Sequence, residues 1–251
     1  MKLTILGSGV AIPGKRNKNC SSYLLENDGI QLVLDFGRGA FQSLFEAGID
    51  YNEIDTFYIS HPHPDHYADL VPFFQACKLT RHKPITFFGF SGLSSLIQQI
   101  KALPGVTGKN EAYQFIVHEF EPGDTFSISS LACSFFEMKH QGLNALGIRI
   151  VNPSNNIFAY TGDTAINENL HPLALNADCF VTECSFTQDD QRYPGHITPI
   201  EIAQTAAQAM VKKIVLSHIY PFTDSERVVR EVKKLFAGEV VSAYEGLSLT
   251  F

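Results

Sequence analysis

The stretch Ser60-His61-Pro62-His63-Pro64-Asp65-His66 carries the strongest signal in this chain of 251 residues. Three histidines and one aspartate fall within six residues, directly after a run of strand-forming residues. Imidazole and carboxylate groups are the ligands that zinc and similar cations prefer. His61 and His63 are two positions apart and can project the same way from an extended segment. Asp65 and His66 can turn toward a neighbouring point, so the stretch predicts two metal ions that each still lack ligands.

The missing ligands must come from distant parts of the chain. Three candidates each follow a strand-like run, and they are His140, Asp163 and His218. A carboxylate placed between two cations can bind both, so Asp163 is the natural bridging ligand.

Composition limits the class of protein. Hydrophobic residues make up 45% and charged residues 18% of the chain, which is typical of a globular protein. The net charge of −7 disfavours a broad nucleic-acid surface. The five cysteines form no C-x-x-C pair and are expected to be reduced and mostly buried. No apolar run is long enough for a signal peptide or a membrane helix, so a soluble cytoplasmic protein is expected.

Short strand-like runs alternate with a few helical segments along the whole chain. The clearest helix begins at Thr198, where Thr-Pro-x-Glu combines a capping residue, a proline and an acidic third position. Strands are predicted at 3–6, 22–25, 31–35, 56–59, 85–88, 114–120, 125–128, 132–138, 147–151, 157–161, 214–216, 240–243 and 247–251. Helices are predicted after Gly39, after His66, and at 94–102, 198–211 and 225–236. This order favours an α/β (α+β) sandwich with its helices outside.

The complete pattern resembles the metal signature of the metallo-β-lactamase superfamily: H-x-H-x-D-H, a distant His, the Asp of Gly-Asp-Thr and a late Ser-His. The resemblance spans nearly the whole chain. It implies that residues 1–251 form a single domain, an αββα sandwich of two central mixed β-sheets flanked by helices. It implies one metal on His61, His63 and His140, another on Asp65, His66 and His218, and a bridge through Asp163. We expect two zinc ions per chain, with manganese as the alternative, because mixed His and Asp sites accept both.

The resemblance also implies hydrolysis as the reaction. His63 stands where the diiron oxidoreductases of the superfamily have a glutamate, which disfavours that branch. A metal-bridging hydroxide would then be the nucleophile. Asp35, which follows an early strand in Leu34-Asp35-Phe36-Gly37, would support the ligands from behind.

Two further segments resemble the ribonuclease Z group of that superfamily. Thr182-Glu183-Cys184-Ser185-Phe186 is similar to its E-[AC]-[TS]-F segment, and Gly195-His196-Ile197-Thr198 is similar to its H-x-T motif. In the group this Glu and His pair beside the metals, and the His protonates the leaving oxygen. A His held by a carboxylate is a good general acid near neutral pH. We therefore predict Asp65, Glu183 and His196 as the catalytic residues.

The opening Gly7-Ser8-Gly9 segment also looks like that group, and such a loop can approach a phosphate closely. The remaining aromatic run, Phe87-Phe88-Gly89-Phe90, is expected to pack in the core, with Phe90 able to reach the mouth of the cleft.

One feature departs from the group. Its members that mature tRNA 3′ ends usually carry a long basic arm between the equivalents of His140 and Asp163, and here that interval is only residues 141–162. We therefore expect a phosphodiesterase acting on a small or flexible phosphodiester, such as a cyclic nucleotide or a short nucleic-acid end. The alternatives are a tRNA 3′-end endoribonuclease, a thioester, lactone or β-lactam hydrolase, and a metal-stabilised binding protein without activity. Relatives are often homodimers, so by analogy a homodimer is expected.

Overall fold

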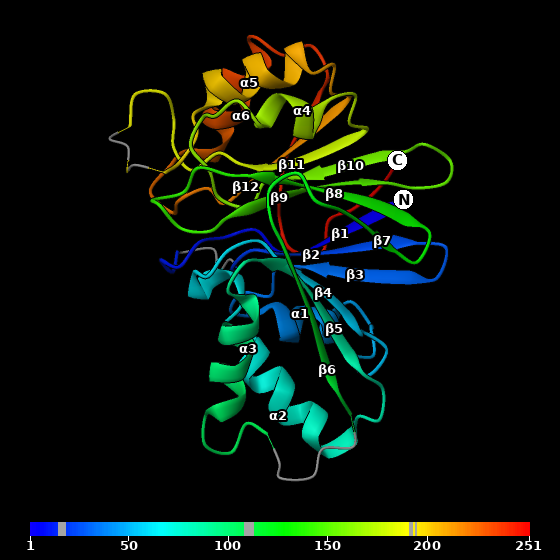
Figure 1. The fold of residues 1–251 in the computed structure, drawn as a ribbon. Coiled ribbons are helices and arrows are strands. Elements are labelled where there is room, and N and C mark those ends of the chain that lie inside the picture. Colours follow the sequence, from blue (N-terminus) through cyan, green and yellow to red (C-terminus); the bar gives the residue numbers. More distant parts are fainter. Residues whose placement is uncertain (15–18, 108–112, 191–192, 194) are drawn as a thin grey trace.

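The computed structural model describes residues 1–14, 19–107, 113–190, 193 and 195–251. The described residues form two facing β-sheets with helices on the outer face of each, an αββα sandwich (Figure 1). This confirms the predicted fold class.

The first sheet is built mainly from the amino-terminal half. Its seven described strands lie in the order β14-β1-β2-β3-β4-β5-β6. The neighbours from β3 to β6 are parallel, and β14, β1, β2 and β3 pair antiparallel. The strands are β1 (Lys2–Gly7), β2 (Ser22–Asn27), β3 (Ile30–Leu34), β4 (Thr56–Ile59), β5 (Ile85–Phe90), β6 (Phe115–Phe120) and β14 (Ser248–Thr250).

The second sheet has seven described strands in the order β13-β12-β11-β10-β9-β8-β7. Strands β10 to β13 are parallel, and β7 to β10 pair antiparallel. The strands are β7 (Thr125–Ile128), β8 (Leu131–Glu137), β9 (Leu146–Val151), β10 (Ile157–Tyr160), β11 (Cys179–Glu183), β12 (Lys213–Ser217) and β13 (Glu239–Ser242).

Helices cover the two outer faces separately (Figure 1). The first sheet carries α1 (Ala40–Glu46), α2 (Leu70–Thr80) and α3 (Leu93–Ala102), and the second carries α4 (Leu170–Ala174), α5 (Pro199–Gln208) and α6 (Ser225–Lys233). A short 3-10 helix, η1 (Pro64–His66), lies inside the histidine-rich stretch. No helix among the described residues is both long enough and apolar enough to cross a membrane.

One apolar core extends from the space between the sheets to the space under α1 to α3, and a second lies under α4 to α6. Between the sheets the ring of Tyr58 stacks on that of Phe135, and on the helix side of the first sheet Phe57 packs against Phe73 of α2. The second contains Ile202, Ala206 and Val228 among others. Because the two sheets share a core, we retain the prediction that residues 1–251 form one domain.

Parallel strands bring their carboxyl ends to the same edge of a sheet, and this edge is where both sheets place their polar residues. Asp35 follows β3 and Ser60 follows β4 in the first sheet. In the second sheet Glu183 ends β11 and His218 follows β12, while Asp163 lies three residues beyond the end of β10. This is the position where ligands bind in open α/β sheets.

Two elements of the second half were not singled out in the sequence. Strand β11 is a buried parallel strand with no polar alternation, and α4 has only five residues, so neither has a clear periodic pattern. The expectation that Phe90 can reach the mouth of the cleft is corrected. Its side chain is 3% exposed and packs in the first apolar core.

Candidate metal centre

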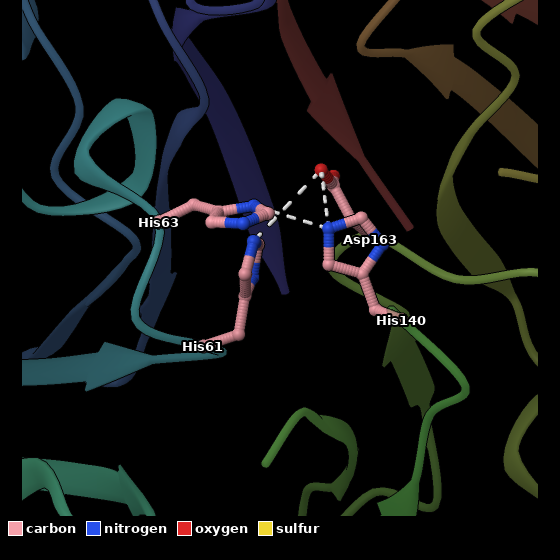
Figure 2. A group of neighbouring side chains, drawn as sticks. All are labelled: His61, His63, His140 and Asp163. Atoms are coloured by element: carbon pink, nitrogen blue, oxygen red, sulfur yellow. Dashed lines mark hydrogen bonds and ion pairs between the residues drawn. The ribbon is translucent and has the colours of Figure 1, made fainter. Parts of the chain in front are cut away.

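All seven predicted metal ligands come together at the common edge of the two sheets. Their ligand atoms form two neighbouring groups, and within each group the atoms lie within 4.8 Å of one another. One group is His61, His63, His140 and Asp163, and the other is Asp65, His66 and His218. Figure 2 shows the first group, with His61 and His63 pointing toward His140 and Asp163 from the opposite side.

Asp163 lies between the two groups. Its Oδ2 is 3.9 Å from His61 Nε2 and 3.8 Å from His140 Nε2 in the first group. Toward the second group, Oδ2 is 3.2 Å from His218 Nε2 and Oδ1 is 3.5 Å from His66 Nε2. One carboxylate thus reaches both groups, which is the arrangement that a bridging ligand requires.

Asp65 lies at the more open side of the second group. Its Oδ2 is 3.4 Å from His218 Nε2 and 4.0 Å from His66 Nε2. Burial by itself would raise the pKa of Asp65, but the hydrogen bond with His218 and the charge of His66 outweigh it and lower that pKa. The carboxylate is therefore ionised, as a metal ligand must be.

Outer partners fix the orientation of the ligand imidazoles. His140 donates from Nδ1 to the carbonyl oxygen of Gly195 at 2.8 Å, and His218 Nδ1 lies 3.2 Å from Ser185 Oγ. Gly195 is required there, because it has a φ of +99° and a Cβ on it would lie 3.0 Å from His140 Nδ1. With Nδ1 engaged, each of these rings presents Nε2 to the centre.

Asp35 organises a ligand in each group from a fully buried position. His66 donates from Nδ1 to Asp35 Oδ2 at 2.6 Å, which leaves His66 Nε2 for the second group. The Ser60 hydroxyl donates to the same oxygen at 2.7 Å, so it is free to accept from His61 Nδ1 at 3.0 Å. The Tyr160 hydroxyl also donates to Asp35. The sequence-based expectation that Asp35 supports the ligands agrees with this network.

The site passes a direct test of fit to metal ions. His61 Nε2 and His66 Nε2 are buried and have no hydrogen-bond partner among the described residues. A buried polar atom without a partner costs about 1–3 kcal/mol, so a cation is the partner that this nitrogen-rich pocket lacks. Burial lowers the pKa of His61 and of His63, with neighbouring histidines adding to the effect, so both imidazoles are neutral and able to coordinate.

Glu183 and His196 form a second polar pair beside the centre. His196 Nδ1 lies 2.8 Å from Glu183 Oε2 and 3.0 Å from Oε1. Burial would lower the pKa of His196, but the charge of Glu183 and its hydrogen bond outweigh burial and raise that pKa to about 9. The ligand atoms of Glu183 and His196 lie within 4.8 Å of those of His140 and Asp163. The predicted pair is therefore assembled next to the metal ligands.

Ser185 is a site residue that the sequence did not single out. Its hydroxyl donates to Glu183 Oε2 at 2.6 Å and lies 3.2 Å from both His196 Nδ1 and His218 Nδ1. Ser185 therefore connects Glu183 and His196 to His218, a predicted metal ligand. The sequence signal that could have identified Ser185 is its position within the motif at 182–186.

Two backbone amides of the amino-terminal segment Gly7-Ser8-Gly9 are engaged within the protein. The amide of Ser8 donates to Glu245 Oε1 at 3.2 Å, and the amide of Gly9 donates to the Asn19 carbonyl at 2.7 Å. These two amides are therefore not available to a phosphate, and the approach of the loop to a phosphate stays a prediction.

A cavity of about 540 Å³ opens beside Glu183 and His196, lined by Ile12, Gln141, Tyr193, His196 and Tyr220. Its volume lies in the range of small-molecule sites. His196 is largely buried, with 7% of its surface exposed, and it lines this cavity. The arrangement can bind cations, hold an anionic substrate against them and deliver a proton from His196.

Comparison with known proteins finds similarity along nearly the whole chain. Residues 1–237 match the family model described as Anti-Pycsar protein Apyc1. The uncharacterized protein ML1173 of Mycobacterium leprae is 30% identical over 98% of this chain and 87% of its own length. The probable metallo-hydrolase YhfI of Bacillus subtilis is 27% identical over 98% of both chains.

Solved structures show the same fold. The metallo-β-lactamase fold protein YhfI from Bacillus subtilis superposes with a TM-score of 0.86 at 25% identity, covering 99% of each chain. The short form of human tRNase Z superposes with a TM-score of 0.81 at 22% identity, covering 100% of this chain and 99% of its own. The chain thus has the metallo-β-lactamase fold and belongs to the family described as Anti-Pycsar protein Apyc1.

Proposed function

We propose that this protein is a phosphodiesterase that uses two metal ions, zinc by preference, and acts on a small or flexible phosphodiester. The observation that carries the proposal is the position of His196. The His196 ring is hydrogen-bonded to Glu183 and lines an open cavity. One of its nitrogens lies within 4.8 Å of the ligand atoms of His140 and Asp163. A proton donor at this place serves a reaction in which a poor leaving group, such as an alkoxide, must depart.

The protein side chains divide the work between binding and proton transfer. His61, His63 and His140 would hold one cation, Asp65, His66 and His218 the other, and Asp163 both. Cations held there would lower the pKa of water and neutralise charge on the attacked phosphate. His196, oriented by Glu183, would give its proton to the departing oxygen. Ser185 limits the rotation of both His196 and His218, so donor and ligand keep a fixed relation.

The hairpin between His140 and Asp163 supports a small substrate over tRNA. The hairpin of strands β9 and β10, with the turn between them, fills most of the interval. The turn is closed by the Asn152 side chain, which accepts from the amides of Ser154 and Asn156 at 3.1 and 2.9 Å. No chain is left in this interval for a clamping arm. The likeness to human tRNase Z at 22% identity supports the fold. It leaves the substrate to be tested.

Hydrolysis of bis(p-nitrophenyl) phosphate tests the proposal. Protein loaded with zinc or manganese should release p-nitrophenolate, and Asp163→Ala should abolish turnover and reduce the metal content measured by plasma mass spectrometry. Asp55→Ala is the matched control, because Asp55 is an exposed carboxylate before β4 and its removal should change neither quantity. Wild-type protein that holds two metals per chain but hydrolyses no diester would contradict the proposal.

A further inference from the structure

Two buried tyrosines lie between the sheets beside the candidate metal centre, and the proposed reaction uses neither of them. Tyr23 belongs to β2 of the first sheet, and Tyr160 ends β10 of the second sheet. Both are buried, and their ring centroids lie 5.1 Å apart with the planes tilted by 58°. A buried hydroxyl needs a hydrogen-bond partner, and here each hydroxyl finds its partner on the opposite sheet. We call Tyr23 and Tyr160 the tyrosine pair.

The two hydroxyls of the tyrosine pair reach across the sheets in opposite directions. The Tyr160 hydroxyl donates to Asp35, which follows β3 of the first sheet. The Tyr23 hydroxyl lies 2.6 Å from the hydroxyl of Ser217, which ends β12 of the second sheet. Ser217 donates its own proton to the Ser8 carbonyl at 3.4 Å, so Tyr23 is the donor of the shorter bond. Burial raises the pKa of Tyr23, which therefore keeps this proton.

Each hydrogen-bond partner of the tyrosine pair is connected to one histidine of the second group. Asp35 accepts from His66 at 2.6 Å, and Ser217 directly precedes His218. The two histidines come from opposite sheets, because His66 follows β4 and His218 follows β12. Their ring centroids lie 5.5 Å apart. The distance between these two ligands therefore depends on how the two sheets are held at this edge.

The backbone of His218 adopts a conformation that its neighbours must maintain. Its φ of +54° lies in the left-handed region, which is unfavourable for a residue with a Cβ. The His218 amide donates to the Ser8 carbonyl at 3.0 Å, and Ser217 donates to the same oxygen. Tyr23 thus holds the residue immediately before this turn of the backbone. Without the Tyr23 hydroxyl, Ser217 loses its shortest side-chain contact and His218 is less firmly placed.

We propose that Tyr23 is a positioning residue for the second group, and that its hydroxyl acts through Ser217 to fix His218 relative to His66. The inference rests on the metal binding that the proposed function requires. Partners of this kind, which orient a ligand without touching the metal, change metal affinity by about 10–100-fold. Because Tyr23 acts through Ser217 and His218, its hydroxyl should matter for one of the two metal-binding steps and much less for the other.

The test is a titration of metal-free protein with zinc in competition with a chromophoric chelator, which gives two dissociation constants. Tyr23→Phe keeps the ring and removes only the hydroxyl, and it should weaken binding at the second group by about tenfold or more. Asp65→Ala removes a ligand of the second group and so identifies which step belongs to it. Ser217→Ala should weaken the same step. Combining it with Tyr23→Phe should add little, because both changes break one hydrogen bond.

Tyr58→Phe is the matched control. Tyr58 is fully buried on β4, and its hydroxyl also crosses between the sheets, donating to the Leu146 carbonyl at 2.6 Å. The Leu146 amide donates to the Ser60 carbonyl at 3.0 Å, so a backbone bond still joins the sheets there when the hydroxyl is removed. Both phenylalanine variants should lower the urea midpoint of the metal-free protein, since each loses a buried hydrogen bond. Only Tyr23→Phe should weaken zinc binding.

The outcomes separate this inference from the proposed function. Zinc binding by Tyr23→Phe equal to wild type, equal losses in Tyr23→Phe and Tyr58→Phe, or additive losses in the double variant would overturn the positioning role and leave the diesterase intact. Weakening of both binding steps to the same extent would overturn the assignment to the second group. Wild-type protein that does not bind two zinc ions would remove the proposed function itself, and this inference with it.

Discussion

Asp35 and Glu183 make the same kind of contacts at the edges of two different sheets. Each is a buried carboxylate at the carboxyl end of a strand, and each receives a histidine Nδ1, at 2.6 Å for Asp35 and 2.8 Å for Glu183. Each also receives a serine hydroxyl, from Ser60 and Ser185 respectively. The difference lies in what the oriented histidine does next.

Asp35 orients a histidine that faces the protein interior, whereas Glu183 orients a histidine that lines a cavity. The histidine of Asp35 is a predicted metal ligand that is fully buried, and the same carboxylate reaches His61 through Ser60. The histidine of Glu183 lines an open cavity. The comparison teaches that one arrangement can set the geometry of a metal site or hold a proton donor for substrate, according to whether the ring faces the core or the cavity. Three substitutions test this division.

Asp35→Ala should have the largest effect. It removes the acceptor of four buried donors, which are the Ser60 amide, the Ser60 hydroxyl, His66 Nδ1 and the Tyr160 hydroxyl. Each unsatisfied donor costs about 1–3 kcal/mol. We expect the free energy of unfolding to fall by about 3 kcal/mol or more, with loss of metal from both groups. Urea unfolding and metal analysis measure the two effects.

Asp35→Asn is the control for that experiment. It keeps the size of the side chain and one acceptor oxygen, so it should unfold more readily than wild type but less readily than Asp35→Ala. Full metal occupancy and unchanged stability in Asp35→Ala would show that Asp35 does not organise the centre.

Glu183→Gln should affect catalysis more than metal binding. The variant keeps an acceptor for Ser185 but loses the charge that raises the pKa of His196. We expect a fall of about 10²-fold in the turnover of a diester with an alkoxide leaving group, in the range of general acid catalysis, with metal content close to wild type. In a His196→Ala background the same change should cost little more, because Glu183 then has no donor to orient. Additive losses in the double variant would contradict the outward role of Glu183.

Thr198→Ala should have the smallest effect, and it tests whether the start of α5 helps Glu183 to position His196. Thr198 and Glu201 form the capping box of α5, and the Thr198 amide donates to Glu201 at 2.9 Å. Loss of the Thr198 hydroxyl should lower the free energy of unfolding by about 1 kcal/mol. Because His196 is held by Glu183 rather than by α5, activity should remain near wild type, and Thr198→Ser should recover the stability. A large loss of activity would show that the helix start positions His196.

The cluster of candidate metal ligands could be predicted from the sequence, because each residue follows a strand-like run and is of a type, histidine or aspartate, that binds metal ions. His61 and Asp163 belong to compact motifs, and the carboxyl ends of parallel strands bring such motifs together. The contacts among the aromatic rings beside the site could not be predicted in this way. Phe186 and Tyr193 lie in the connection between β11 and α5, and Phe222 lies in the connection between β12 and α6. Only the packing of these two segments makes the three rings neighbours.

Ser185 illustrates a different limit. It lies within a motif, yet a serine there has no pattern that reveals three partners on three segments. The amides of Ser8 and Gly9 illustrate another limit, since glycine content shows that a loop can approach a phosphate but not whether its amides are already engaged.

The most direct test of the account measures how much the enzyme needs His196 for leaving groups of different quality. Bis(p-nitrophenyl) phosphate releases an anion that departs without a proton, whereas opening the ring of cyclic adenosine monophosphate releases an alkoxide that needs one. The account predicts that His196→Ala lowers turnover of the cyclic nucleotide by about 10²–10⁴-fold and changes turnover of the nitrophenyl diester far less. Equal losses on both substrates, with metal content unchanged, would contradict the assignment of His196 as the proton donor.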